Sequence, residues 1–199
     1  MRVAAVVLAA GKSSRMGRNK LLLEVDGATV LDRLLVSLTS VLGEVIVVTG
    51  NDPEPIRAVA ELHSARVVHN PNYEEGMTTS FQAGLRAASA DAAFLVLGDQ
   101  LGLEPSLLWR MIDVMEGDQS ALIVSPICEG KRGHPTLFRR PLFSEILRLR
   151  GEETLKDVVL RHESEHRTVD VDEWTVLDLD TPEDYEKALR LLRSNRASP

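Results

Sequence analysis

The sequence is short of the features that mark secreted, membrane-bound or nucleic-acid-binding proteins. It has one cysteine, Cys128, and no glycosylation sequon, so we expect no internal disulfide and a reducing, cytoplasmic setting. No apolar run approaches the roughly 20 residues that span a bilayer, and the strand-like N-terminus does not resemble a signal peptide. Acidic residues outnumber basic ones by 30 to 23, which gives a net charge of −7. That charge argues against a general nucleic-acid-binding protein.

What the sequence does have is a regular alternation of apolar and amphipathic segments. Apolar runs predict buried strands at residues 3–8, 44–49, 65–69, 92–97, 120–126 and 175–180, and helical spacing covers 53–62, 78–88, 104–116 and 181–192. Repeated βα units imply right-handed crossovers and a parallel sheet. We therefore expect an α/β protein with a three-layer, doubly wound, mainly parallel sheet of the Rossmann-like type.

The length of the chain bounds its domain organisation. Its 199 residues suffice for one well-buried domain and are too few for two large ones, so residues 1–199 are expected to form a single domain. Residues 129–172 are less regular, because glycines and prolines precede a polar helical stretch at 153–162. We expect this part to be a lid-like subregion that completes one side of a cleft.

The loop after the first predicted strand is the most informative segment. Residues 8–11 (Leu-Ala-Ala-Gly) are small enough for the backbone to approach a ligand, and Lys12, Arg15 and Lys20 follow. Cations in such a loop can offset the charge of a polyphosphate. The glycine spacing fits neither a Walker A loop nor G-x-G-x-x-G. The alternative is a solvated basic loop of an ordinary α/β domain.

Carboxylates are predicted at the same edge of the sheet, where ligands bind in open parallel sheets. Asp99 follows the strand at 92–97, and Asp178 and Asp180 end the last predicted strand. Carboxylate oxygens suit Mg²⁺, which keeps positions for substrate phosphates. A cationic loop with a metal fits phosphoryl chemistry. Taken singly, each carboxylate has an ordinary alternative as a turn residue or a solvent-facing strand residue.

A second unusual loop, residues 69–80, leads from a strand into a helix. The hydroxyls of Thr78, Thr79 and Ser80 fall in the first turn of that helix. They could cap the helix, or they could bind a base, a ribose or a phosphate at its N-terminus.

Three histidines carry weaker signals. His134 lies between Gly133 and Pro135, where it either packs in the loop or contacts a substrate phosphate. His162 and His166 have the H-x-x-E-H spacing of some zinc peptidases. Because this stretch is polar on all sides, a solvated helix end is the favoured interpretation.

The motifs together resemble those of one enzyme family. They occur in order over nearly the whole chain: Leu8-Ala9-Ala10-Gly11, Ser14-Arg15-Met16-Gly17, Lys20, Asn70-Pro71, Glu75-Gly76-Met77, Ser80, Ala83-Gly84-Leu85, Gly98-Asp99-Gln100, Gly133-His134-Pro135 and residues 178–184. This pattern resembles the MobA-like nucleotidyltransferases, and within them the molybdenum cofactor cytidylyltransferase branch.

The resemblance implies a reaction and a set of roles. CMP would pass from CTP to the phosphate of molybdopterin cofactor, with Mg²⁺ bound and pyrophosphate released. The implied catalytic residues are Arg15, Lys20 and Asp99, the metal ligands are Asp99 with Asp178 or Asp180, and His134 lies on the acceptor side, within 129–172. The implied nucleotide-binding residues are Leu8, Ala9, Ala10, Gly11, Lys12, Ser13, Asn70, Gly76, Met77 and Ser80.

Three segments depart from the family pattern and keep other functions open. Leu101 follows Gln100 where the family usually has proline, residues 78–81 read Thr-Thr-Ser-Phe, and residues 151–156 lack the usual acceptor-region motif. One alternative is the same chemistry with a sugar or small organic phosphate as acceptor, or with another nucleoside triphosphate. A second is a non-catalytic nucleotide- or pterin-binding chaperone that delivers the cofactor to a molybdoenzyme, which is also a possible partner of the enzyme.

Overall fold

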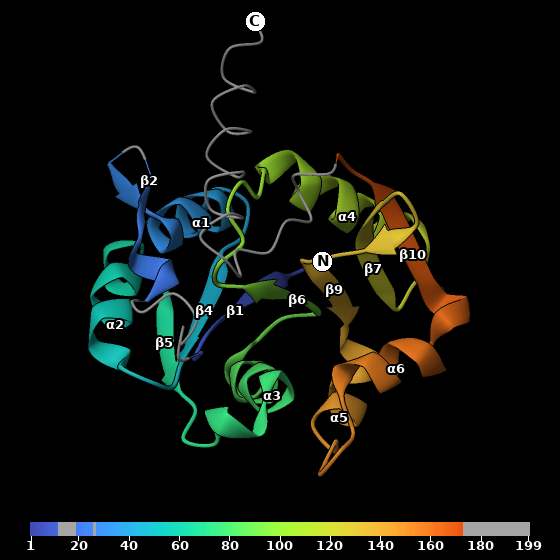
Figure 1. Cartoon of the computed structure of the whole chain (residues 1–199). Coiled ribbons are helices and arrows are strands. Elements are labelled where there is room, and N and C mark those ends of the chain that lie inside the picture. The colour runs from blue at the N-terminus through green and yellow to red at the C-terminus, as the bar shows by residue number, and fades with distance from the viewer. Residues whose placement is uncertain (12–18, 26, 173–199) are drawn as a thin grey trace, which may run out of the picture.

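The computed structural model describes residues 1–11, 19–25 and 27–172. Its centre is an eight-stranded sheet in the order β10-β7-β9-β6-β1-β4-β5, with β8 paired to β7 (Figure 1). The strands are β1 (Val3–Ala9), β4 (Glu44–Thr49), β5 (Arg66–His69), β6 (Ala92–Leu97), β7 (Ile123–Cys128), β8 (Lys131–Arg132), β9 (Thr136–Arg139) and β10 (His166–Asp170). A separate small sheet pairs β2 (Glu24–Val25) with β3 (Ala28–Thr29).

Helices cover both faces of the sheet. They are α1 (Val30–Thr39), α2 (Pro53–Leu62), α3 (Met77–Ala87), α4 (Pro105–Gly117), α5 (Phe143–Ile146) and α6 (Leu155–Arg161), with 3₁₀ turns η1 (Lys20–Leu22), η2 (Tyr73–Glu75), η3 (Arg140–Leu142) and η4 (Glu163–Glu165). No helix in the described ranges is long and apolar enough to cross a membrane.

The alternation of side chains along the strands divides the core into two clusters. On β1, Val7 packs with residues of α1, α2 and α4 on one face, and Val6 packs with residues of α3, α5 and α6 on the other. Both valines are fully buried, as expected for strands covered on both faces. The expected three-layer α/β fold with a mainly parallel sheet is therefore confirmed.

The first five predicted strands are present, and the helix at 53–62 is found at its predicted bounds. Asp52 is the N-cap residue of α2, but it adopts a left-handed conformation and its side chain makes no capping bond. The sequence analysis did not predict α1, although Thr29 and Asp32 form a reciprocal capping box at its start. The predicted strand at 175–180 and helix at 181–192 lie outside the described residues.

Residues 129–172 are more regular than predicted. Strand β9 lies between β6 and β7 and is antiparallel to both, while β10 pairs in parallel with β7. Helices α5 and α6 contribute to the second core cluster. The segment was difficult to recognise because β9 has only four residues and is closely preceded by Gly133 and Pro135.

Candidate functional site

The carboxyl ends of four parallel strands meet at one edge of the sheet. Leu8 of β1 pairs with Leu97 of β6 on one side and with Val48 of β4 on the other. The amide of Gly98 donates to the carbonyl of Leu8 over 3.1 Å. A Cβ at Gly98 would lie only 2.8 Å from that oxygen, so the close approach of these two chain segments requires glycine. This contact places the end of β1 beside the loop that carries Asp99.

Lys20 and Asp99 form an ion pair at this edge. Lys20 begins the 3₁₀ turn η1, whose amide at Leu21 donates to the side chain of Asn19 over 3.1 Å. The Lys20 ammonium contacts one carboxylate oxygen of Asp99. Asp99 is only 8% exposed, and burial of a carboxylate is costly unless the group is paired. The structure thus brings together two of the three residues predicted to be catalytic.

The loop between β5 and α3 is organised by Asn70. Its buried side chain donates to Ser80 Oγ over 3.0 Å and to Thr79 Oγ1 over 3.1 Å, and it accepts from the amide of Asn72 over 3.0 Å. These bonds hold the loop against α3. In this structure Asn70 and Ser80 therefore position the loop through bonds within the protein.

None of the three predicted hydroxyls is the N-cap of α3. The helix begins at Met77, its N-cap is Gly76 with φ of 111°, and no side chain caps it. Glycine is needed there because that backbone conformation strains other residues. The first amides of α3 consequently have no side-chain cap, an arrangement that suits an anion.

The backbone of His134 is bonded to Gln100, the residue that follows Asp99. The side-chain amide of Gln100 donates to the carbonyl oxygen of His134. Burial lowers the pKa of His134, while the nearby negative charge of Asp99 opposes that shift. The imidazole is therefore neutral near pH 7 and lies within electrostatic range of the predicted metal ligand.

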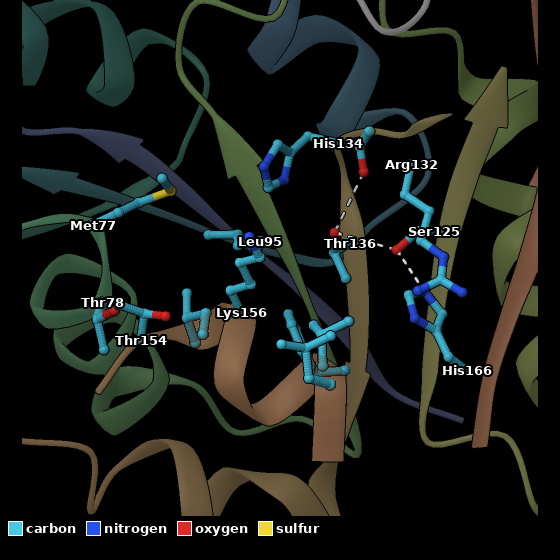
Figure 2. A pocket seen from close by; sticks show the side chains of 15 residues that line it. Met77, Thr78, Leu95, Ser125, Arg132, His134, Thr136, Thr154, Lys156 and His166 are labelled. Atoms are coloured by element: carbon cyan, nitrogen blue, oxygen red, sulfur yellow. Dashed lines mark hydrogen bonds between the residues drawn. The ribbon is translucent and has the colours of Figure 1, made fainter. Parts of the chain in front are cut away.

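A cavity of about 540 Å³ opens beside His134 (Figure 2). Its walls come from α3, β6, β7, β9 and α6, so it lies on the sheet face covered by α3, α5 and α6. It is lined by Met77, Thr78, Leu95, Ser125, Arg132, Gly133, His134, Thr136, Phe138, Thr154, Leu155, Lys156, Val159, Leu160 and His166. The predicted residues Met77 and His134 are thus brought to one cavity, and residues 129–172 supply much of its wall.

A second, more polar cavity of about 630 Å³ adjoins the loop between β5 and α3. Asn70, Thr79 and Arg86 line it, and Thr78 and Thr154 line both cavities. The two cavities are therefore neighbours, one polar and the other mainly apolar. Such a pair can accept a ligand with two chemically different parts.

The sequence analysis did not identify a polar cluster in the apolar cavity. His166 Nε2 lies 2.9 Å from Ser125 Oγ, and Ser125 Oγ lies 3.4 Å from Thr136 Oγ1. All three side chains are buried. Ser125 and Thr136 could have been noticed as hydroxyl residues within apolar strands, but their meeting with His166 depends on the pairing of β7, β9 and β10.

Unpartnered polar atoms gather in this part of the protein. In the described part of the chain, four buried side-chain atoms have no hydrogen-bond partner, and three of them are Gln100 Oε1, His134 Nδ1 and His166 Nδ1. Buried groups without partners are costly and uncommon in folded proteins. Their concentration here marks the region as a candidate ligand site.

The zinc-peptidase interpretation fails on geometry. His162 bonds to Glu145 over 2.8 Å, whereas His166 begins β10 and faces Ser125. Among residues 1–11, 19–25 and 27–172, no group of three or more histidine, cysteine, aspartate or glutamate side chains could hold a metal ion. The spacing of His162 and His166 therefore does not create a zinc site.

The donor set at Asp99 fits a different type of metal. One nearly buried carboxylate at this edge of the sheet fits Mg²⁺, which proteins bind through one or two carboxylates together with substrate phosphates. The other predicted ligands, Asp178 and Asp180, lie outside the described residues, as do Lys12, Ser13 and Arg15.

Comparison with known proteins identifies relatives over nearly the full chain. Residues 5–195 match the MobA-like NTP transferase domain family. The molybdenum cofactor cytidylyltransferase of Escherichia coli K12 is 29% identical over 90% of this chain and 92% of its own. A probable molybdenum cofactor guanylyltransferase of Methanosarcina acetivorans is also 29% identical, over 93% of this chain and 89% of its own.

Solved structures with the same fold include a metal complex. Rv0371c from Mycobacterium tuberculosis H37Rv is 32% identical and superposes with a TM-score of 0.82, covering 96% of this chain and 98% of its own. A second structure of Rv0371c, in complex with manganese, is 30% identical with a TM-score of 0.78, covering 96% and 99%. A divalent metal therefore binds a relative of this chain.

Proposed function

The chain belongs to the MobA-like NTP transferase family and is a nucleotidyltransferase, and from this premise we propose that it transfers CMP from CTP to the phosphate of molybdopterin cofactor. Mg²⁺ is the proposed metal and pyrophosphate the leaving group. The observation that carries the proposal is the Lys20–Asp99 pair at the end of β1 and β6. It joins a cation for phosphate oxygens to a carboxylate for the metal.

Each residue has a distinct part in this reaction. Asp99 would hold Mg²⁺, which would supply electrostatic stabilisation to the phosphate oxygens. Lys20, which contacts Asp99 at the edge of the sheet, would offset the negative charge that develops on the leaving pyrophosphate. Catalysis rests on positioning and charge, so no covalent nucleophile is required.

The nucleotide and the acceptor are assigned to different sides. Leu8–Gly11 and the start of α3 face the nucleotide, with Gly76 leaving the helix amides without a side-chain cap. His134 and the apolar cavity receive the acceptor. In this arrangement residues 129–172 are the acceptor-side part of a single nucleotidyltransferase domain. A cytoplasmic setting and delivery of the product to a molybdoenzyme belong to the same proposal.

The choice of nucleotide and acceptor needs a direct test. The relatives include both cytidylyltransferases and guanylyltransferases, so another nucleoside triphosphate or another phosphorylated acceptor is the second candidate. A purely binding function is disfavoured, because a carrier of nucleotide or pterin has little need for both Lys20 and Asp99 at the phosphate edge.

Pyrophosphate release distinguishes these functions. The protein is incubated with Mg²⁺ and each of the four nucleoside triphosphates, with and without molybdopterin cofactor. Release with CTP and the pterin together supports the proposal. Release with a different pair keeps the chemistry and replaces the substrate, whereas nucleotide binding without release with any pair contradicts the assignment of this chain as a transferase. Asp113→Asn, at an exposed position on α4, is the matched control for variants of Asp99.

A further inference from the structure

Two segments at the carboxyl edge of the sheet are joined by one side chain. Gln100 directly follows Asp99, and its side-chain amide donates to the backbone carbonyl oxygen of His134. Because a carbonyl oxygen can only accept, Nε2 of Gln100 is the donor and Oε1 remains as an acceptor. Gln100 therefore connects the segment that carries the proposed metal ligand to the segment on the proposed acceptor side.

The segment around Gln100 is firmly held. Its backbone amide donates to the carbonyl oxygen of Leu97 over 3.2 Å and closes a turn at the end of β6. Leu101 and Leu103, which follow, are only 5% and 4% exposed, so they anchor the chain beyond the turn in the protein interior. The position of Gln100 relative to Asp99 is thereby fixed from both ends of the segment.

The segment around His134 is attached at two other points. It follows a hairpin of exposed residues, 129–132, in which the two-residue strand β8 pairs with β7. The amide of Gly133 donates to the carbonyl oxygen of Pro126 over 3.0 Å, and β9 begins two residues after His134. The bond from Gln100 falls between these attachments and sets the distance from His134 to the turn after β6.

Stability alone does not account for a glutamine at this position. Gln100 is 5% exposed, and in the described part of the chain its Oε1 has no hydrogen-bond partner. A buried amide oxygen without a partner costs at least as much as one amide–carbonyl bond contributes. Methionine has a similar length and would fill the same space without that cost. The benefit of the glutamine therefore lies in what its bond to His134 holds in place.

We propose that Gln100 is a positioning residue, which holds the acceptor-side segment at His134 in a fixed relation to Asp99 so that the acceptor phosphate approaches the nucleotide in the reacting geometry. The inference rests on the proposed function and adds a residue that acts through His134. Gln100 itself is assigned no contact with either substrate.

The two segments are close enough for their relative position to matter. Burial lowers the pKa of His134, and the negative charge of Asp99 opposes that shift, so the carboxylate is felt at the imidazole. A displacement of the reacting groups by about 1 Å can cost about a hundredfold in rate. A single bond that sets this separation can consequently affect turnover without contributing to nucleotide affinity.

The first test is the division of the effect between kcat and KM. Gln100→Met removes the donor and keeps the length of the side chain. With the substrate pair that gives pyrophosphate release, kcat per folded molecule should fall about tenfold or more, while the KM of the nucleotide stays within about threefold of wild type. Gln119→Met is the matched control, because exposed Gln119 donates to the carbonyl oxygen of Glu116 over 3.2 Å, and it should keep wild-type kinetics.

Hydrogen exchange gives a measurement that does not depend on turnover. Mg²⁺ with each of the four nucleoside triphosphates is added separately, without acceptor, and amide exchange is followed at residues 8–11 and 130–134. In the wild type and in Gln119→Met, the nucleotide that protects residues 8–11 should also slow exchange at 130–134. In Gln100→Met the protection of residues 8–11 should remain and that of 130–134 should be lost. A merely structural role would not separate these two responses to the nucleotide.

The outcomes distinguish this inference from the proposed function. Unchanged protection of residues 130–134 in Gln100→Met, or its absence in a wild type whose residues 8–11 are protected, overturns the inference and leaves the proposed reaction standing. Coupled protection that depends on Gln100, without transfer to molybdopterin in the wild type, supports the inference and contradicts the proposed acceptor. Failure of every nucleotide to protect residues 8–11 contradicts both.

Discussion

Acidification should destabilise the protein through His166. The pKa of this imidazole is about 4 in the folded chain, chiefly because of burial, against about 6.5 when the chain is unfolded. Between these values the unfolded chain binds more protons than the folded one. The stability associated with His166 is therefore fully present above pH 6.5 and falls as the pH drops towards 4.

The size of the effect follows from these two values. Between pH 7 and pH 5 the linkage amounts to about 2 kcal/mol of lost unfolding free energy. Two groups near His166 do not obscure this window, because the bond between Arg132 and Glu163 raises the pKa of Arg132 and lowers the pKa of Glu163 from its usual value. A loss of that size is a large fraction of the stability of a typical domain.

Urea unfolding at pH 7, 6 and 5 measures the effect against a matched variant. His166→Asn has no titrating group at this position, so its unfolding free energy should fall by about 2 kcal/mol less than that of the wild type over the same interval. Any other histidine, including His134 with its own lowered pKa, contributes to both proteins and cancels in the difference. Parallel pH curves for the two proteins would refute the burial of a neutral His166.

Four further substitutions test the site and the core. Asp99→Ala should reduce turnover by about a hundredfold or more while thermal unfolding and circular dichroism stay close to wild type, and near-normal turnover would exclude the metal assignment. Lys20→Ala should lower kcat by about a hundredfold and leave the KM of the acceptor unchanged, so a change confined to acceptor KM would contradict its role. Gly11→Ala should change stability by less than about 0.5 kcal/mol, because the added Cβ would meet no atom within 4 Å among the described residues beyond its chain neighbours, yet it should raise the KM for CTP. In Gly84→Ala the Cβ would lie 2.2 Å from a methyl group of Val6, and urea unfolding should show a loss of about 1–3 kcal/mol, with an unchanged midpoint arguing against this packing.

Much of the fold was predictable because its signals are local. The apolar runs of β1, β4 and β6 identify buried strands, and Pro53 marks the start of α2 at its observed residue. Strand β9 carried no comparable signal, since its four residues gain stability only from pairing with β6 and β7 on both sides. Pairing over such distances in the sequence is a tertiary effect that local patterns do not record.

The candidate site likewise has residues that could be predicted from the sequence and residues that could not. Lys20 and Asp99 were predictable because both follow strands whose carboxyl ends meet at one edge, and the structure pairs them. The chain His166–Ser125–Thr136 was not predictable, because each residue belongs to a different strand and only the order β10-β7-β9 brings them together. Residues that act through a shared cavity are recognised only once the strand order is known.

The central place of β9 has a consequence for how the protein is made. During synthesis β6 emerges already able to pair with β1, but its other edge stays open until Thr136–Arg139 has left the ribosome about forty residues later. An unpaired edge of this kind invites association with other chains. The nascent protein therefore exposes the β6 edge to other chains from the emergence of β6 until that of β9, and α6 and β10, which complete the wall of the apolar cavity, follow only later.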